Sequence, residues 1–160
     1  MGRIWAWQTS WNMVKAHPLT GVGFGQRAYL ESYDAYRAVP EDHPHAAHSV
    51  WFALMGETGL IGLGLYAWML YQSLVVTRQV MRMSVQRAGR KGEWDWNYAA
   101  GLQCTLITFI IAGTFLSQPR FEYVLVICTI VVPLYMLSRA QQPVLSPLRS
   151  TTPQPATVGR

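Results

Sequence analysis

The chain has 160 residues, 51% of them hydrophobic and 13% charged, with a formal net charge of +5. A soluble protein of this length would form one domain, but here the apolar residues gather in long blocks, which is typical of membrane proteins. A soluble bundle of buried helices is the alternative, and the last block argues against it because it has no polar face. The membrane topology derived below explains the net positive charge, so the charge does not require a nucleic-acid partner.

The chain opens with "RIWAWQTSWNMVKAH", in which Ile4, Trp7, Trp11 and Val14 recur at heptad spacing. This spacing predicts an amphipathic helix. The helix should stop before Pro18, because the residue that precedes a proline disfavours the helical region.

The next stretch, "PLTGVGFGQ", spaces three glycines by two residues, at Gly21, Gly23 and Gly25. Glycines permit unusual backbone angles and close approach of the backbone to a partner. A phosphate cradle is conceivable, but the spacing matches neither the dinucleotide-binding nor the P-loop pattern. The following "RAYLESYDAYRA" predicts a second short helix that ends before Pro40.

Three apolar blocks then predict transmembrane helices at about 50–76, 97–117 and 121–137. Each is near the ~20 residues that a helix needs to cross ~30 Å of hydrocarbon, although the third is short. Aromatic residues mark several of their ends, as at the headgroup level of a bilayer. We therefore expect an all-α integral membrane protein in which a segment of short helices and loops, residues 1–49, precedes three transmembrane helices.

The positions of the basic residues indicate which ends of these helices face the cytoplasm. Between the first two blocks lie five of them, Arg78, Arg82, Arg87, Arg90 and Lys91. The segment 139–160 carries three arginines and no acid, and its Pro, Ser and Thr content predicts a disordered tail. Short basic loops stay in the cytoplasm, so residues 1–49 and the turn at 119–122 should face the periplasm of a bacterial inner membrane.

All four histidines fall in this outward segment, and His43, His45 and His48 directly precede the first transmembrane block. They could bind a metal with Glu41 or Asp42, but the spacing matches no standard zinc pattern. We interpret His43 and His45 as solvated loop residues. The alternative to an enzyme is a small membrane protein whose histidine-rich outer loop binds a metal or a partner.

The order "R…W…W…HPLTGVGFG…Y…AHSVWFALMGETGLIGL" closely resembles the C-terminal signature of the O-antigen ligase and polymerase superfamily. Within that superfamily, the segment is most similar to the O-glycosylation ligases associated with exosortase systems. The resemblance covers roughly residues 3–65. It implies the C-terminal part of a larger inner-membrane glycosyltransferase of lipopolysaccharide or exopolysaccharide biosynthesis. Such an enzyme moves a glycan from a polyprenyl diphosphate carrier to a lipid or protein hydroxyl, with no metal or other cofactor.

The resemblance assigns roles only where residues match. His48 occupies the position of the histidine proposed to activate the acceptor hydroxyl, and Arg3 that of an arginine proposed to hold the diphosphate. Glu57, Gly59 and Gly62 match the element that follows the histidine. For Glu57 we favour a structural hydrogen bond inside the protein over a catalytic role.

The residue types suit this chemistry on their own. Displacing a diphosphate from an anomeric carbon needs fork-shaped cationic donors for the leaving group and a base for the incoming hydroxyl. Arginine supplies the fork, and histidine accepts a proton near neutral pH. Arg27 is a further candidate for binding anionic substrate, though a solvated helix face explains it as well.

Overall fold

Five helices make up most of the described chain, and no β-strand occurs within residues 2–86, 90–116 and 121–140. The computed structural model describes these three ranges. The helices are α1 (Gly2–Ala16), α2 (Gln26–Tyr36), α3 (Val50–Val85), α4 (Arg90–Ala112) and α5 (Phe121–Ala140). The expected all-α class is confirmed for these residues, whereas the predicted turn at 119–122 and the tail lie largely outside them.

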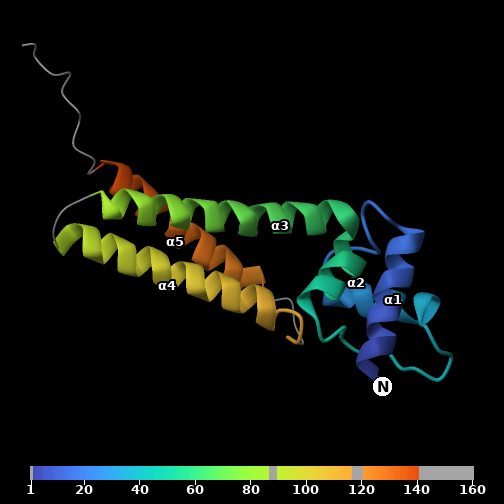
Figure 1. Ribbon diagram of the computed structural model, residues 1–160. Helices are drawn as coiled ribbons and strands as arrows, with labels where there is room; N and C mark the ends of the chain where they lie inside the picture. Colours follow the sequence, from blue (N-terminus) through green and yellow to red (C-terminus); the bar gives the residue numbers. More distant parts are fainter. Residues whose placement is uncertain (1, 87–89, 117–120, 141–160) are drawn as a thin grey trace, which may run out of the picture.

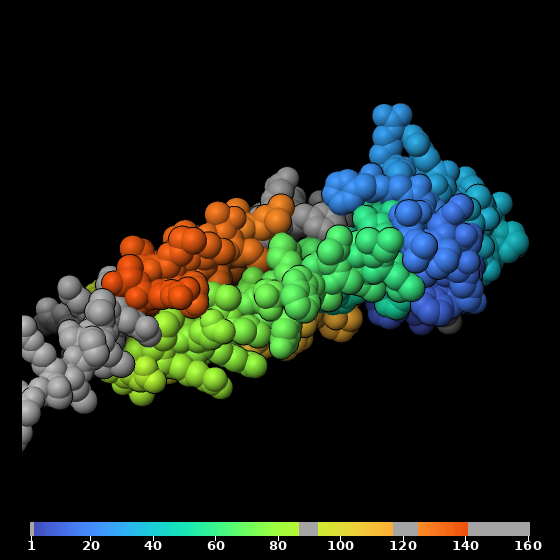
Figure 2. Space-filling model, turned by 90° about the horizontal axis from the view of Figure 1, so that it is seen from above, coloured from blue at the N-terminus to red at the C-terminus, as the bar shows by residue number. Residues whose placement is uncertain are grey.

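The helices form two packed units that share α3. Figures 1 and 2 show α3, α4 and α5 as an elongated bundle, with α1, α2 and their connections gathered at one end. The bundle core consists of Val50, Leu54, Tyr66, Leu70 and Leu106. The end unit has its own core of Met13, Tyr29, Tyr33, Ala47 and Ala53. The first turns of α3 contribute to both cores and so join the two units.

Helix α1 ends at Ala16, before Pro18 as predicted, but only part of its apolar stripe is buried. Ile4 and Trp11 are 60% and 48% exposed. The buried residues are instead small or polar for the most part: Ala6, Thr9, Ser10, Met13 and Val14. This polar face is tolerated because its hydroxyls are paired; Ser10 Oγ, for example, donates to the Ala6 carbonyl at 3.0 Å. Of the four residues at heptad spacing, Val14 is buried and Trp7 packs on Phe52, so the apolar stripe forms only part of the buried face.

Helix α3 is broken at Gly59, whose φ of 65° and ψ of −160° are not helical. Figure 1 shows its first turns leaving the axis of the long part. A continuous helix would bond the N–H groups of Leu60 and Ile61 to the carbonyls of Gly56 and Glu57. The break removes these two bonds and leaves four backbone groups in need of partners.

The loop between α1 and α2 supplies all four partners. Leu60 N and Ile61 N donate to the carbonyls of Pro18 and Leu19, at 2.9 and 3.3 Å. In return, Val22 N and Gly23 N donate to Gly56 O and Glu57 O, both at 3.0 Å. We call residues 18–25 the docking loop. It replaces the missing helical bonds and fastens the end unit to α3.

The break leaves a straight helix from Leu60 to Val85, which continues beyond the predicted end near Val76. At ~1.5 Å per residue its length is about 39 Å, more than the ~30 Å of a hydrocarbon core. Within the described residues α3 alone is long and apolar enough to cross a membrane, and only 22% of its most apolar stretch is buried. A core helix of a soluble protein would be mostly buried, so this exposure favours a lipid surrounding.

The two later helices also differ from their predicted bounds. Helix α4 begins at Arg90 and ends at Ala112, well before the predicted end at 117. Helix α5 extends to Ala140 and contains Pro133, and its apolar part Leu125–Ala140 is short for a span. These two helices do not by themselves establish the three predicted spans.

Candidate active site

His48 lies in the connection between α2 and α3, immediately before the first turn of α3. Its φ of 51° is the only positive value among the described non-glycine residues. Such a conformation costs about 1–3 kcal/mol and persists only where the surroundings hold it. The flanking backbone is tied on both sides. Trp7 Nε1 donates to Ala47 O at 2.8 Å, and Val50 N donates to Gly113 O at 2.8 Å.

We call residues 37–49, which connect α2 to α3, the histidine loop. His45 joins this loop to the start of α1. Its Nε2 lies 3.0 Å from the Gly2 carbonyl and its Nδ1 lies 2.6 Å from the His43 carbonyl. Carbonyl oxygens only accept, so a ring that makes both bonds donates from both nitrogens. The His45 ring centroid lies 6.2 Å from that of His48. The interpretation of His45 as a solvated loop residue was therefore wrong.

The buried carboxylate of Asp42 and the phenol of Tyr33 contact each other next to His45. Tyr33 donates to Asp42 Oδ2 at 2.5 Å, and Asp42 Oδ1 lies 3.6 Å from His45 Nδ1. Burial raises the pKa of Tyr33, and the hydrogen bond to Asp42 acts in the same direction. Burial likewise raises the pKa of Tyr29 to about 12, so both phenols stay protonated and can donate. Nothing in the sequence indicated Tyr33 as a partner, because it comes from α2 and the other two residues come from the loop.

Ser49 is a further residue that the sequence analysis did not single out. It is 1% exposed, and its Oγ has no hydrogen-bond partner among the described residues. It neighbours His48 in "AHSVW" and occupies the N-cap of α3 without forming a side-chain cap. A buried hydroxyl without a partner is costly in a packed protein, which makes Ser49 a candidate contact for a bound group.

The two predicted arginines have different surroundings. Arg3 is exposed in the first turn of α1 and directly follows Gly2, whose carbonyl contacts His45. The fold thus brings the backbone around Arg3 to the histidine loop. Arg27 lies on α2 with its side chain 91% exposed, and its Nε donates to Glu31 at 2.8 Å. The described contacts do not join Arg27 to His48.

Glu57, Gly59 and Gly62 position the site from the α3 side. Glu57 is 2% exposed, and its Oε2 accepts a hydrogen bond from Gly25 N at 3.0 Å. Gly59 is the break itself. At Gly62 an added Cβ would lie 2.0 Å from Thr58 Oγ1, a hydroxyl that donates to Leu54 O at 2.7 Å. These three residues lie in or next to the bent start of α3, which directly follows His48 and Ser49 in the chain.

The metal-binding alternative gains no support from this geometry. Within the described ranges, no group of three His, Cys, Asp or Glu side chains is arranged to hold a metal ion. The two nitrogens of His45 face backbone carbonyls, which leaves neither directed at a shared centre with His43 and His48.

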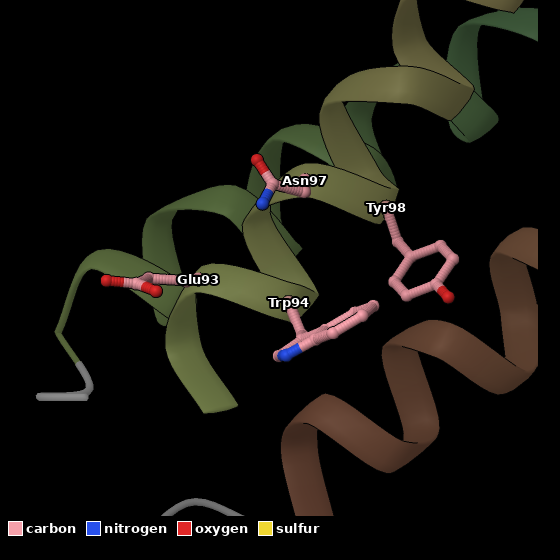
Figure 3. A pocket seen from close by; sticks show the side chains of 4 residues that line it. All are labelled: Glu93, Trp94, Asn97 and Tyr98. Atoms are coloured by element: carbon pink, nitrogen blue, oxygen red, sulfur yellow. The ribbon is translucent and has the colours of Figure 1, made fainter. Parts of the chain in front are cut away.

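A hollow lies far from His48, near the start of α4. It has a volume of about 540 Å³ and is lined by Glu93, Trp94, Asn97 and Tyr98. The rings of Trp94 and Tyr98 stack with their centroids 5.9 Å apart, and Figure 3 shows Glu93 pointing away from both rings. All four residues come from one helix surface, and the start of α4 lies at the opposite end of the bundle from α1 and α2 (Figure 1). This hollow is not part of the candidate site.

One comparison with known proteins gives a match, which covers the end unit. Residues 1–67 match the family model Wzy_C, described as O-antigen ligase. Neither the curated proteins nor the solved structures yielded a match. The matched residues contain α1, α2, the docking loop, the histidine loop and the broken start of α3. The match supports the O-antigen ligase superfamily and, in general terms, a membrane enzyme that acts on a lipid-linked glycan.

Proposed function

We propose that this chain carries the acceptor-activating site of an O-antigen-ligase-like glycosyltransferase at the periplasmic face of a bacterial inner membrane. One observation carries the proposal: His48 is held in a strained conformation at the entrance of α3, inside the region that matches the ligase family. Strained residues concentrate at functional sites, and His48 is the only such non-glycine residue in the described ranges.

In the proposed step, His48 accepts the proton of an acceptor hydroxyl. The hydroxyl oxygen attacks the anomeric carbon of the glycan and forms the new glycosidic bond. The bond from that carbon to the diphosphate oxygen breaks, and polyprenyl diphosphate leaves with the electron pair. A neutral imidazole can act in this way because one ring nitrogen accepts a proton.

Arg3 is proposed to bind the diphosphate and to stabilise the negative charge that develops as it leaves. Its exposure leaves the guanidinium accessible, and its neighbour Gly2 is joined to His45. Arg27 is the weaker candidate, because its guanidinium is engaged with Glu31.

The membrane arrangement is part of the proposal. We infer that α4 and α5 cross the bilayer beside α3, with residues 1–49 on the periplasmic side of the membrane. Apolar side chains exposed on these helices support this arrangement: Ile107, Ile111, Leu125, Val126, Ile130 and Met136. The segment "HPLTGVGFG" resembles O-glycosylation ligases and further favours a ligase of that kind, which acts on a lipid or protein hydroxyl.

Complementation tests the proposed function. Cells that lack their own copy of the gene would receive the wild type or a variant, and glycan transfer would be measured at equal protein amounts. His48→Ala should lower transfer roughly 100-fold or more, the range of general-base contributions. Arg3→Lys should also impair it, because a point charge does not reproduce bidentate contacts.

His43→Ala is the matched control, because it keeps the backbone carbonyl that His45 contacts. It should transfer normally. If His48→Ala transfers normally while His43→Ala does not, the base has been assigned to the wrong histidine.

A further inference from the structure

We propose that the docking loop is embedded in the lipid bilayer beside α3, with Leu19 and Phe24 in contact with acyl chains. This inference concerns a surface that the proposed reaction does not use, and it does not depend on the role of His48.

The apolar surface of the loop is continuous with that of the membrane helix. Leu19 is 60% exposed and Phe24 is 74% exposed. Ile61, which donates its N–H to the Leu19 carbonyl, is itself 53% exposed on α3. Leu60, bonded to Pro18 O, is exposed as well. The exposed face of the transmembrane helix therefore extends directly onto the loop.

At least four of the seven backbone N–H groups of the loop are bonded to protein groups. Gly21 N donates to His17 O at 3.0 Å, and Gly25 N donates to the Glu57 carboxylate at 3.0 Å. Val22 N and Gly23 N are bonded to α3, as described above. A loop in water needs no such partners, because water hydrates its backbone. Within a bilayer, irregular backbone is tolerated only where protein groups satisfy it.

The charges around the loop indicate its depth. The segment "PLTGVGFG" contains no charged side chain, whereas Lys15 and Arg27 lie on either side of it in the sequence. Lys15 Nζ lies 5.9 Å from the ring centroid of Trp11, which is itself exposed. Tryptophan and basic side chains are typical of the headgroup level. An apolar tip between two such boundaries fits lipid better than water or the surface of another protein.

Spin labelling tests the embedding. Single cysteines would replace Leu19 or Phe24 in a chain that also carries Cys104→Ser and Cys128→Ser. Each protein would be reconstituted in vesicles of phosphatidylethanolamine and phosphatidylglycerol and labelled with a nitroxide. Collision rates with oxygen, which concentrates in lipid, and with a nickel chelate, which stays in water, give the depth of each label. Leu65 on the exposed face of α3 is the lipid control, and Asp34 on α2 is the water control.

We expect labels at 19 and 24 to favour oxygen over nickel several-fold, like the label at 65. Nickel access equal to that at 34 would place the loop in water and overturn the proposal. Low access to both reagents would show that a protein surface covers the loop, which would overturn it as well. Because both side chains are exposed, the labels should not disturb folding. A photoactivatable phenylalanine at 24 gives a second measurement, in which a lipid adduct is expected.

Discussion

At Gly21 the docking loop comes so close to α3 that an added Cβ would lie 2.5 Å from the carbonyl oxygen of Glu57. Gly59 faces the loop in the same way, with an added Cβ 2.6 Å from the Leu19 carbonyl. Both residues also have positive φ values, of 64° and 65°. Gly21→Ala and Gly59→Ala should therefore each lower the free energy of unfolding by at least about 1–3 kcal/mol.

Gly64→Ala is the control, because nothing lies within 4 Å of its added Cβ. It should be neutral or stabilising by roughly 0.5–1 kcal/mol, as for other helix-interior glycines. Thermal unfolding in detergent measures all three, and 1 kcal/mol corresponds to about 2–4 °C in a chain of this size. Equal melting temperatures for the three variants would disprove the close docking.

The contacts of His45 predict a second effect at the residue scale. His45→Ala removes the bridge between the Gly2 and His43 carbonyls, so Arg3 and His48 should lose their relative placement. Glycan transfer should fall several-fold at unchanged protein amount. His45→Gln keeps a donor and should recover part of the loss. Transfer by His45→Ala equal to that of His43→Ala would show that the bridge does not position the site.

At the scale of elements, one side chain joins α1 to the start of α3. Trp7 stacks on Phe52 with ring centroids 5.0 Å apart and donates to the Ala47 carbonyl at 2.8 Å. Trp7→Phe keeps an aromatic ring but loses the donor. We expect a loss of about 1 kcal/mol in stability, the usual size of one hydrogen bond, and a larger proportional loss of transfer. If stability falls but transfer per folded protein does not, the bond has no role in positioning His48.

The sequence predicted the existence of the elements better than their details. Pro18 correctly marked the end of α1, because its effect on the preceding residue is local. Helix α2 ends before Pro40 as predicted, but already at Tyr36, beyond the reach of that effect. The break at Gly59 has no local signal, since the other glycines of "GETGLIGLGL" stay helical and the bonding partners of the break lie in the loop around Leu19. The glycine spacing did predict close backbone approach, but not that the partner would be α3. The heptad pattern marked only part of the buried face of α1, because small and polar residues make up the rest.

The same limit applies to the site. The family resemblance indicated His48 and Arg3, because each is recognised from the residues next to it in the sequence. Asp42 and His45 are three residues apart, but Tyr33 joins them only because the chain folds α2 against the histidine loop. The spacing of Tyr33 from Asp42 does not encode this contact.

At the scale of the whole molecule, the proposed topology is open to labelling. Single cysteines at Asp34 and Gln86, in a chain without Cys104 and Cys128, would be exposed to a membrane-impermeant maleimide in spheroplasts. Asp34 should react in intact spheroplasts, and Gln86 only after permeabilisation, because the basic residues near the end of α3 and the start of α4 hold that side in the cytoplasm. The reverse pattern would contradict the orientation and, with it, the placement of His48 in the periplasm.

The release of polyprenyl diphosphate tests the proposed site most directly. Membranes from cells without a chromosomal copy of the gene, supplied with the wild type or a variant, would receive a lipid-linked glycan and its acceptor. The wild type should release one equivalent of polyprenyl diphosphate for each glycan transferred. His48→Ala should bind the carrier as well as the wild type does but release it roughly 100-fold more slowly or worse, and His43→Ala should match the wild type. Release by His48→Ala at the wild-type rate would contradict the assignment of His48 as the base.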